Sequence, residues 1–150
     1  MKKIKILLFL AGIIFLASTC ENENCHKSIP FVNSSDKDLY VLLKTLPPND
    51  TSFLEFGNPT RNDEHRVLPH SEKKLSLRRD CYEGKPELQI YILDVHIFDT
   101  NSWKTVVEDY LILQRYDLTP DDVKALNWSI PYPPTPAMKN MKMYPPYKEE

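Results

Sequence analysis

The stretch ELQIYILDVHIFD, residues 87–99, carries the strongest structural signal in the chain. Alternation along an extended strand places Leu88, Ile90 and Ile92 on one face, and apolar residues also occupy most of the other face. An antiparallel strand with one solvated face is apolar on its buried face only, so apolar residues on both faces predict a central strand covered on both faces, or a bulge midway. A sheet built around residues 87–99 is therefore the expected centre of the fold.

The rest of the chain also reads mainly as strands with short connections. Alternating or short apolar runs between turn residues predict further strands at residues 28–33, 39–44, 73–79, 110–118 and 128–132. The gaps are too small for repeated crossover helices. We therefore predict a mainly β fold, an antiparallel β-sandwich or open barrel with one or two short helices. The alternative is an α+β sheet with one helix across a face.

The clearest helix signal lies near the C-terminus, in LTPDDVKALNW. Thr119 suits the N-cap, Pro120 suits the first helical position, and Asp122 stands three residues after the cap, where it can complete a capping box. These signals predict a helix over residues 120–126. The segment NSWKTVVEDY, residues 101–110, predicts one or two further helical turns.

Domain boundaries follow from these elements. The helical turns of residues 101–110, which Asn101 or Ser102 is suited to cap, lie inside the predicted domain. The predicted single domain spans residues 28–134, and the following stretch, TPAMKNMKMYPPYKEE, has no periodicity. We therefore predict that residues 135–150 form a disordered tail.

The first twenty residues, MKKIKILLFLAGIIFLASTC, have the order of an export signal. Three lysines precede an uncharged apolar stretch from Ile6 to Leu16, and small residues follow it. The stretch is short for a membrane-spanning helix, and it is apolar on every face and uncapped, unlike a core helix. We expect residues 1–19 to be a signal peptide that is removed.

The cleavage region resembles the lipobox of bacterial lipoproteins, in which a run of small residues ends at an acylated cysteine. The resemblance implies that Cys20 is lipidated and becomes the mature N-terminus, with residues 20–27 as a tether. Leu16 lies four positions before this cysteine, where the family usually has leucine three before. A secreted protein cut near Ala17, with Cys20 free for disulfide pairing, is the alternative. A multiply acylated cysteine holds a protein at a membrane lastingly.

The cysteine count agrees with this assignment. The chain has three cysteines, and if Cys20 is acylated, Cys25 and Cys81 remain as an even pair. We predict a disulfide between them, which is permitted outside the cytoplasm. The spacing is not that of a zinc site, and three glycines, widely separated, build no phosphate-binding loop. We therefore predict neither a metal nor a cofactor.

The charge and the motifs of the chain narrow the range of functions that it can have. Without the signal segment, 16 basic and 21 acidic residues remain, a formal charge of −5, which argues against a nucleic-acid partner. The histidines His26, His65, His70 and His96 have no metal-binding spacing, and G-x-S-x-G is absent. Asp94, inside the apolar run, is the most anomalous carboxylate. It marks an acid site with a raised pKa, or faces outward at a bulge, or pairs with an arginine.

The stretch ILQRYDLTPDDVKALNWSIPYPP, residues 112–134, resembles the C-terminal signature of small uncharacterised lipoproteins of Bacteroidetes. The matching residues are Arg115, Tyr116, Asp117, Leu118, Leu126, Asn127 and Trp128, and the RDCYE segment around Cys81 is also similar. The resemblance covers about a third of the chain and implies location and fold kinship, with no activity. In some of these lipoproteins, acidic residues behind the acylated cysteine signal display on the outer face. Glu21 and Glu23 resemble that signal, or form a solvated linker.

Two functional hypotheses follow. The first is a non-catalytic binding or structural module anchored at the outer membrane by its lipid, on the periplasmic or surface face, with an envelope protein or glycan as partner. Its candidate binding residues are Trp103, Trp128 and Tyr132, and core packing is the alternative for the two tryptophans. Tyr144 and Tyr147 are further candidates, in a tail that docks a partner. The second is a hydrolase that uses an acid pair near Asp94.

Overall fold

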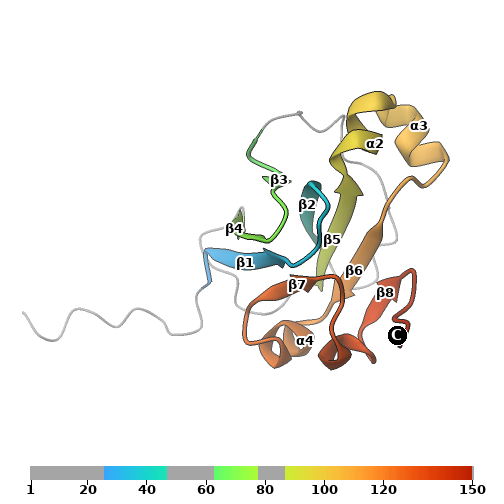
Figure 1. The fold of residues 1–150 in the computed structure, drawn as a ribbon. Helices are drawn as coiled ribbons and strands as arrows, with labels where there is room; N and C mark the ends of the chain where they lie inside the picture. Colours follow the sequence, from blue (N-terminus) through green and yellow to red (C-terminus); the bar gives the residue numbers. More distant parts are fainter. Residues whose placement is uncertain (1–25, 47–62, 78–86, 150) are drawn as a thin grey trace, which may run out of the picture.

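The structure, a computed structural model, describes residues 26–46, 63–77 and 87–149 (Figure 1). These segments are mainly β, as predicted. Their strands are β1 Ser28–Asn33, β2 Leu39–Leu46, β3 Arg66–Val67, β4 Ser71–Ser76, β5 Glu87–Asp94, β6 Gln114–Leu118, β7 Ile130–Tyr132 and β8 Lys142–Tyr144. Their helices are α2 Val95–Thr100, α3 Trp103–Glu108, α4 Pro120–Ala125 and the short 3₁₀ helix η1 Pro136–Met138.

The described strands form two sheets that do not close into a barrel. One sheet has five antiparallel strands in the order β3-β2-β5-β6-β8. The other has the order β4-β1-β7, in which β1 pairs antiparallel with β4 and parallel with β7. β5, the strand that carries the strongest sequence signal, is the middle strand of the larger sheet, as its pattern predicts.

The main core lies between the two sheets. β1 alternates between buried and half-buried residues and directs Ile29 and Phe31 inward. The larger sheet contributes Leu39, Val41, Leu88, Ile90, Ile92, Tyr116 and Leu118 to the same cluster, all of them fully buried. Full burial of one such side chain is worth about 1.5–3 kcal/mol relative to exposure, so this interface dominates the stability of the domain.

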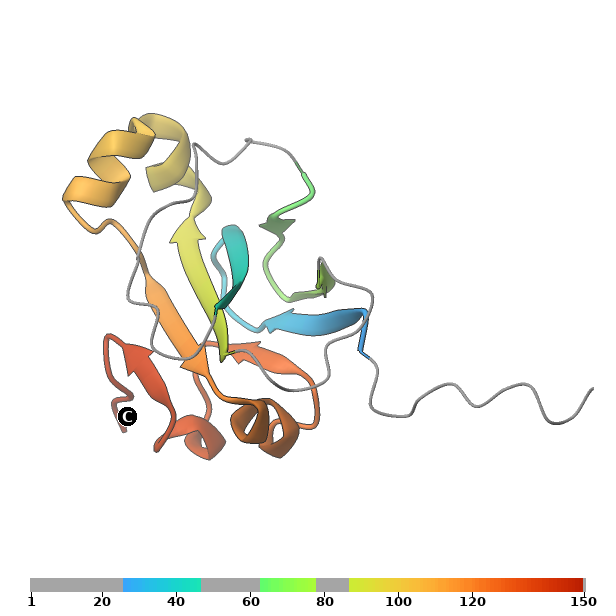
Figure 2. The same cartoon turned by 180° about the vertical axis from the view of Figure 1, so that it is seen from behind.

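The opposite face of the larger sheet is covered by α2 and α3, which lie together at one end of it (Figure 1, Figure 2). Phe98 of α2 packs on Tyr40, with ring centroids 4.8 Å apart, and meets Trp103 edge-on at 6.0 Å. Tyr91 and Leu93 of β5 belong to this second cluster. Both faces of β5 are therefore covered, which confirms the prediction of a central strand.

The predicted extension of this strand to residue 99 is wrong. β5 ends at Asp94, and residues 95–100 form α2. The Asp94 carboxylate accepts a hydrogen bond from the His96 backbone N–H at 2.9 Å, which caps the helix. The helical turn brings Phe98 back over the sheet and leaves His96 exposed, whereas in an extended strand these two side chains, two residues apart, would lie on the same face.

The other two helices begin where the sequence predicts. Ser102 caps α3 by accepting from the Thr105 N–H at 3.1 Å. Thr119 and Asp122 form the full capping box of α4, with Pro120 in the first turn. No helix in the described segments has both the length and the apolar character that a membrane span requires.

The prediction of a disordered tail is also wrong. Pro136–Met138 is the 3₁₀ helix η1, and Lys142–Tyr144 is β8, which pairs antiparallel with β6. Met138 is fully buried in the main core, and the Gln114 side chain donates to the Pro145 carbonyl at 2.7 Å. Buried methionine and a paired strand edge hold this segment in place, so the domain continues past residue 134.

The turn between β1 and β2 is organised by a buried asparagine. Asn33 is 1% exposed, and its amide donates to the carbonyls of Lys37 at 2.7 Å and Leu68 at 3.0 Å. Its side-chain oxygen accepts from the Ser35 N–H at 3.0 Å and from the Ser35 hydroxyl at 2.7 Å. One side chain thus fastens the β1–β2 turn to the turn that precedes β4.

Replacement of Asn33 with alanine should lower the free energy of unfolding by about 2–3 kcal/mol, because it removes a buried amide that makes several hydrogen bonds and leaves partly buried carbonyl groups without donors. Urea unfolding of the full chain measures the loss. Ser34→Ala, at an exposed position of the same turn, is the control and should change stability by less than about 0.5 kcal/mol. Equal losses for the two variants would contradict the anchoring role of Asn33.

Candidate functional site

A polar group of side chains occupies the sheet face that α2 and α3 also cover, on β6 and β8. Residues directly opposite each other on paired strands share a face. The register forms two rows across β5, β6 and β8: Gln89, Asp117 and Lys142 in one, and Tyr91, Arg115 and Tyr144 in the next. Tyr116, between Arg115 and Asp117 in the chain, points into the main core instead.

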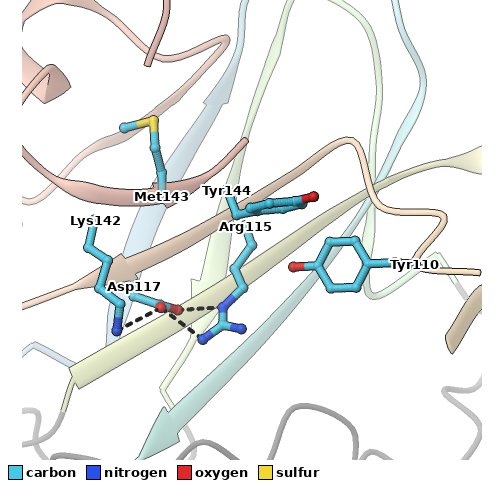
Figure 3. A pocket seen from close by; sticks show the side chains of 6 residues that line it. All are labelled: Tyr110, Arg115, Asp117, Lys142, Met143 and Tyr144. Atoms are coloured by element: carbon cyan, nitrogen blue, oxygen red, sulfur yellow. Dashed lines mark hydrogen bonds and ion pairs between the residues drawn. The ribbon is translucent and has the colours of Figure 1, made fainter. Parts of the chain in front are cut away.

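A buried carboxylate stands at the centre of this group (Figure 3). Asp117 is 5% exposed and accepts from Arg115 Nε at 2.6 Å and Arg115 Nη2 at 2.8 Å. Lys142 Nζ lies 3.2 Å from the same carboxylate, while 74% of the Lys142 side chain is exposed. The Arg115–Asp117 pair is bidentate, which fixes the guanidinium in orientation as well as in position. Asp117 therefore holds two cations side by side at the edge of the sheet.

The environment keeps Arg115 charged. Burial lowers the pKa of its guanidinium, but the hydrogen bond to Asp117 and the neighbouring Tyr91 and Tyr110 outweigh burial, and the net shift is upward. The guanidinium lies 5.7 Å from the centroid of the Tyr91 ring, a cation–π contact. The Tyr91 hydroxyl in turn donates to Gln89 Oε1 at 2.8 Å. The Arg115 guanidinium, the Tyr91 ring and the Gln89 amide thus fix one another's positions beneath the site.

Two tyrosine rings complete an open pocket. Tyr110, which follows α3, and Tyr144 of β8 meet edge-on with ring centroids 5.1 Å apart, and Tyr144 is 57% exposed. We call this the β6–β8 pocket; its volume is about 420 Å³ and its lining residues are Tyr110, Arg115, Asp117, Lys142, Met143 and Tyr144. Figure 3 shows Met143 pointing away from the ion-paired group.

The Tyr110 phenol stays protonated at neutral pH. Burial raises the pKa of Tyr110, a hydrogen bond with Arg115 lowers it, and the net shift is upward. The hydroxyl can therefore donate as well as accept a hydrogen bond, but it offers no phenolate nucleophile. With Asp117 engaged by two cations, the pocket offers donors, positive charge and aromatic surface, and the arrangement is suited to binding.

Tyr110 adopts a backbone conformation that is unusual for its residue type. Its φ is 52°, and it follows the C-cap residue of α3. The Tyr110 N–H donates to the Val107 carbonyl at 3.3 Å and the Leu111 N–H to the Val106 carbonyl at 2.9 Å, the pattern of a Schellman motif. Glycine or asparagine is usual at this position. The residue at the corresponding position after α4 is Asn127, with φ 51°. The tyrosine costs about 1–2 kcal/mol in this conformation, and strain of this kind gathers at functional sites.

Comparison of two variants separates the pocket role of Tyr110 from a role in stability. Tyr110→Gly removes the ring and the backbone strain together, so its free energy of unfolding should stay within about 1 kcal/mol of the wild-type value. Asn127→Tyr places a tyrosine at the matching position of α4 and should lose about 1–2 kcal/mol. Urea unfolding measures both. A far larger loss for Tyr110→Gly would mean that this ring is a packing anchor.

The aromatic residues predicted from sequence as a binding surface do not come together. Trp103 is half-buried against Phe98, and Trp128 stacks on His26 with ring centroids 3.6 Å apart. Tyr132 is 9% exposed and belongs to the main core. Trp103 packs against the second cluster, whereas Trp128 and Tyr132 both pack on the main core, so the three form no common exposed surface. Of the aromatics named from sequence, Tyr144 is the one that lines the β6–β8 pocket.

Asp94 has a structural role. Its carboxylate caps α2 and pairs with Lys37 Nζ at 3.1 Å, so its partner is a lysine. Burial raises the pKa of Asp94, but the hydrogen bonds from Lys37 and the His96 backbone outweigh burial, and the net shift is downward. An acid site would need the opposite shift. Within residues 26–46, 63–77 and 87–149, no three His, Cys, Asp or Glu side chains are grouped so that they could hold a metal ion.

The three cysteines lie outside the described residues, so the lipidation of Cys20 and the Cys25–Cys81 disulfide stay predictions.

The sequence contained one signal for the pocket, because Arg115 and Asp117 are two apart in a predicted strand and must share a face. It contained none for the pairing with β8.

Comparison with known proteins finds no matching family model, no matching curated protein and no matching solved structure.

Proposed function

We propose that the protein is a cell-envelope lipoprotein whose domain is a non-catalytic binding module. Cys20 carries the acyl chains that anchor it in the outer membrane, and residues 20–27 tether the domain. The order of lysines, apolar stretch and small residues before Cys20 supports this location. The β6–β8 pocket is the binding site, and its partner is a glycan or protein of the envelope.

The observation that supports binding is the pair of cations held by buried Asp117 beside the rings of Tyr110 and Tyr144. Preorganised charge and a rigid aromatic surface are what a recognition site needs, because little side-chain entropy is lost when a ligand binds. The same groups are poorly suited to catalysis. Asp117 already accepts two hydrogen bonds from Arg115 and forms an ion pair with Lys142, and the Tyr110 phenol is protonated, so neither is poised as a general base.

Retention of envelope components on the immobilised protein tests the proposal. The full chain in detergent is incubated with solubilised envelopes as wild type, as Tyr144→Ala and as Leu68→Ala. Leu68 is 55% exposed at the turn before β4 and serves as the matched control for an exposed apolar side chain. We expect a component that the wild type and Leu68→Ala retain and Tyr144→Ala loses. Identical retention by all three proteins would contradict a binding site at this pocket.

A further inference from the structure

We infer that the ligand of the β6–β8 pocket is a saccharide that bears a carboxylate, such as a uronic acid. This inference rests on the proposed binding function and names its ligand class. It follows from three features of the pocket: the sign of its charge, the donors that it presents, and the shape of its aromatic surface.

The charge of the lining residues favours an anionic ligand. Arg115 and Lys142 carry two positive charges and Asp117 one negative charge, so the lining is positive by one formal charge in a chain whose net charge is −2. Asp117 is buried beneath its two cations and offers a ligand little surface. A carboxylate placed against Lys142 would balance the excess charge, whereas a cationic ligand would meet repulsion.

The donors are placed for a carboxylate near the pocket rim. The Lys142 ammonium has three N–H donors and forms an ion pair with Asp117 at 3.2 Å, and its side chain is 74% exposed. Arg115, oriented by Asp117 and by the Tyr91 ring, adds fixed positive charge next to it. A ligand carboxylate at this rim gains a charge-assisted hydrogen bond, which is about twice as strong as a neutral one.

The aromatic surface favours a sugar ring. Tyr144 stands edge-on to Tyr110 with much of its ring exposed, so it presents a face on which the C–H groups of a pyranose can stack. The phenol hydroxyls can exchange hydrogen bonds with sugar hydroxyls. The volume of about 420 Å³ lies in the range of small-ligand pockets, about 300–1,000 Å³.

An extended peptide fits the same site less well. Peptides that add to a sheet need a run of free edge backbone. β8 has three residues and is followed at once by Pro145 and Pro146, which have no N–H to donate. A saccharide needs no such edge, so the geometry favours it.

Titration with trigalacturonate and with its methyl ester tests the inference, because the two differ in charge while the sugar rings are the same. Calorimetry on the full chain in detergent should show that the acid binds. The ester should bind at least about tenfold more weakly, because it cannot make the charge-assisted hydrogen bond. The affinity for the acid should also fall as salt is added, because the charges are partly exposed.

Three variants refine the test. Lys142→Gln should weaken binding of the acid roughly tenfold and leave the ester unchanged. Tyr144→Ala should weaken both forms, and Lys139→Gln, an exposed lysine outside the pocket, should change neither. Equal affinity for acid and ester, binding insensitive to both pocket variants, tighter binding of an acidic peptide, or binding of neither sugar would overturn the inference. The binding function itself is judged separately, by the envelope retention experiment.

Discussion

Replacement of Cys20 with alanine is expected to abolish labelling of the protein by a clickable fatty acid and to release the domain from the membrane fraction. The acyl chains are the proposed anchor, and each buried CH₂ of such a chain contributes about 0.8 kcal/mol to membrane binding. The measurement is in-gel fluorescence of the labelled protein together with fractionation of cells.

Cys25→Ala is the matched control, because it removes a cysteine five positions further along the same segment. It should keep the label and stay in the membrane fraction. Labelling that persists in Cys20→Ala would place the acyl group elsewhere or show that the membrane association has another origin. Loss of the label from Cys25→Ala would likewise contradict the assignment to Cys20.

Replacement of Asp117 with alanine should lower the free energy of unfolding by about 3 kcal/mol, the lower end of the cost for a buried ion pair, because it removes the buried carboxylate that pairs with the half-buried Arg115 guanidinium. The Arg115 side chain is 19% exposed and makes two of its hydrogen bonds to this carboxylate. Against a total stability of about 5–15 kcal/mol for a domain, this loss is large. Urea unfolding of the full chain measures it.

Asp121→Ala provides the control for loss of an aspartate on the surface. Asp121 is exposed in the first turn of α4, where its carboxylate favours the helix N-terminus. Its removal should cost only a small part of the Asp117→Ala loss. If the two variants unfold at the same urea concentration, Asp117 does not hold the two cations in place. That result would contradict the view that the pocket is preorganised.

The parts of the fold that the sequence predicts are those with local causes. The apolar pattern of β5 records burial on two faces, because each side chain of a strand faces one neighbouring layer. The capping box at Thr119 is complete within four residues, so α4 could be placed from residue types alone. Ser102 before α3 is a signal of the same kind.

The parts that sequence reasoning missed depend on contacts between distant segments. Asp94 in an apolar run has the pattern of a strand interior. Its role as the N-cap of α2 becomes evident only with the placement of Phe98 over Tyr40, which the local sequence does not indicate. β8 has three residues, too few for any period to show, and its pairing with β6 is what orders it. The β6–β8 pocket depends on that pairing, so Lys142 and Tyr144 could not be placed beside Arg115 from sequence.

The central claim is that ligand binds in the β6–β8 pocket, against the surface that Tyr110 and Tyr144 form, and the NMR signals of aromatic rings test it most directly. Full-length protein with labelled tyrosine and tryptophan is titrated with the envelope component that the wild type retains. We predict that the ring signals of Tyr110 and Tyr144 shift together, while those of buried Tyr116 and of Trp103 and Trp128 stay in place. Shifts confined to the two tryptophans, with the tyrosines of the pocket unchanged, would contradict the account.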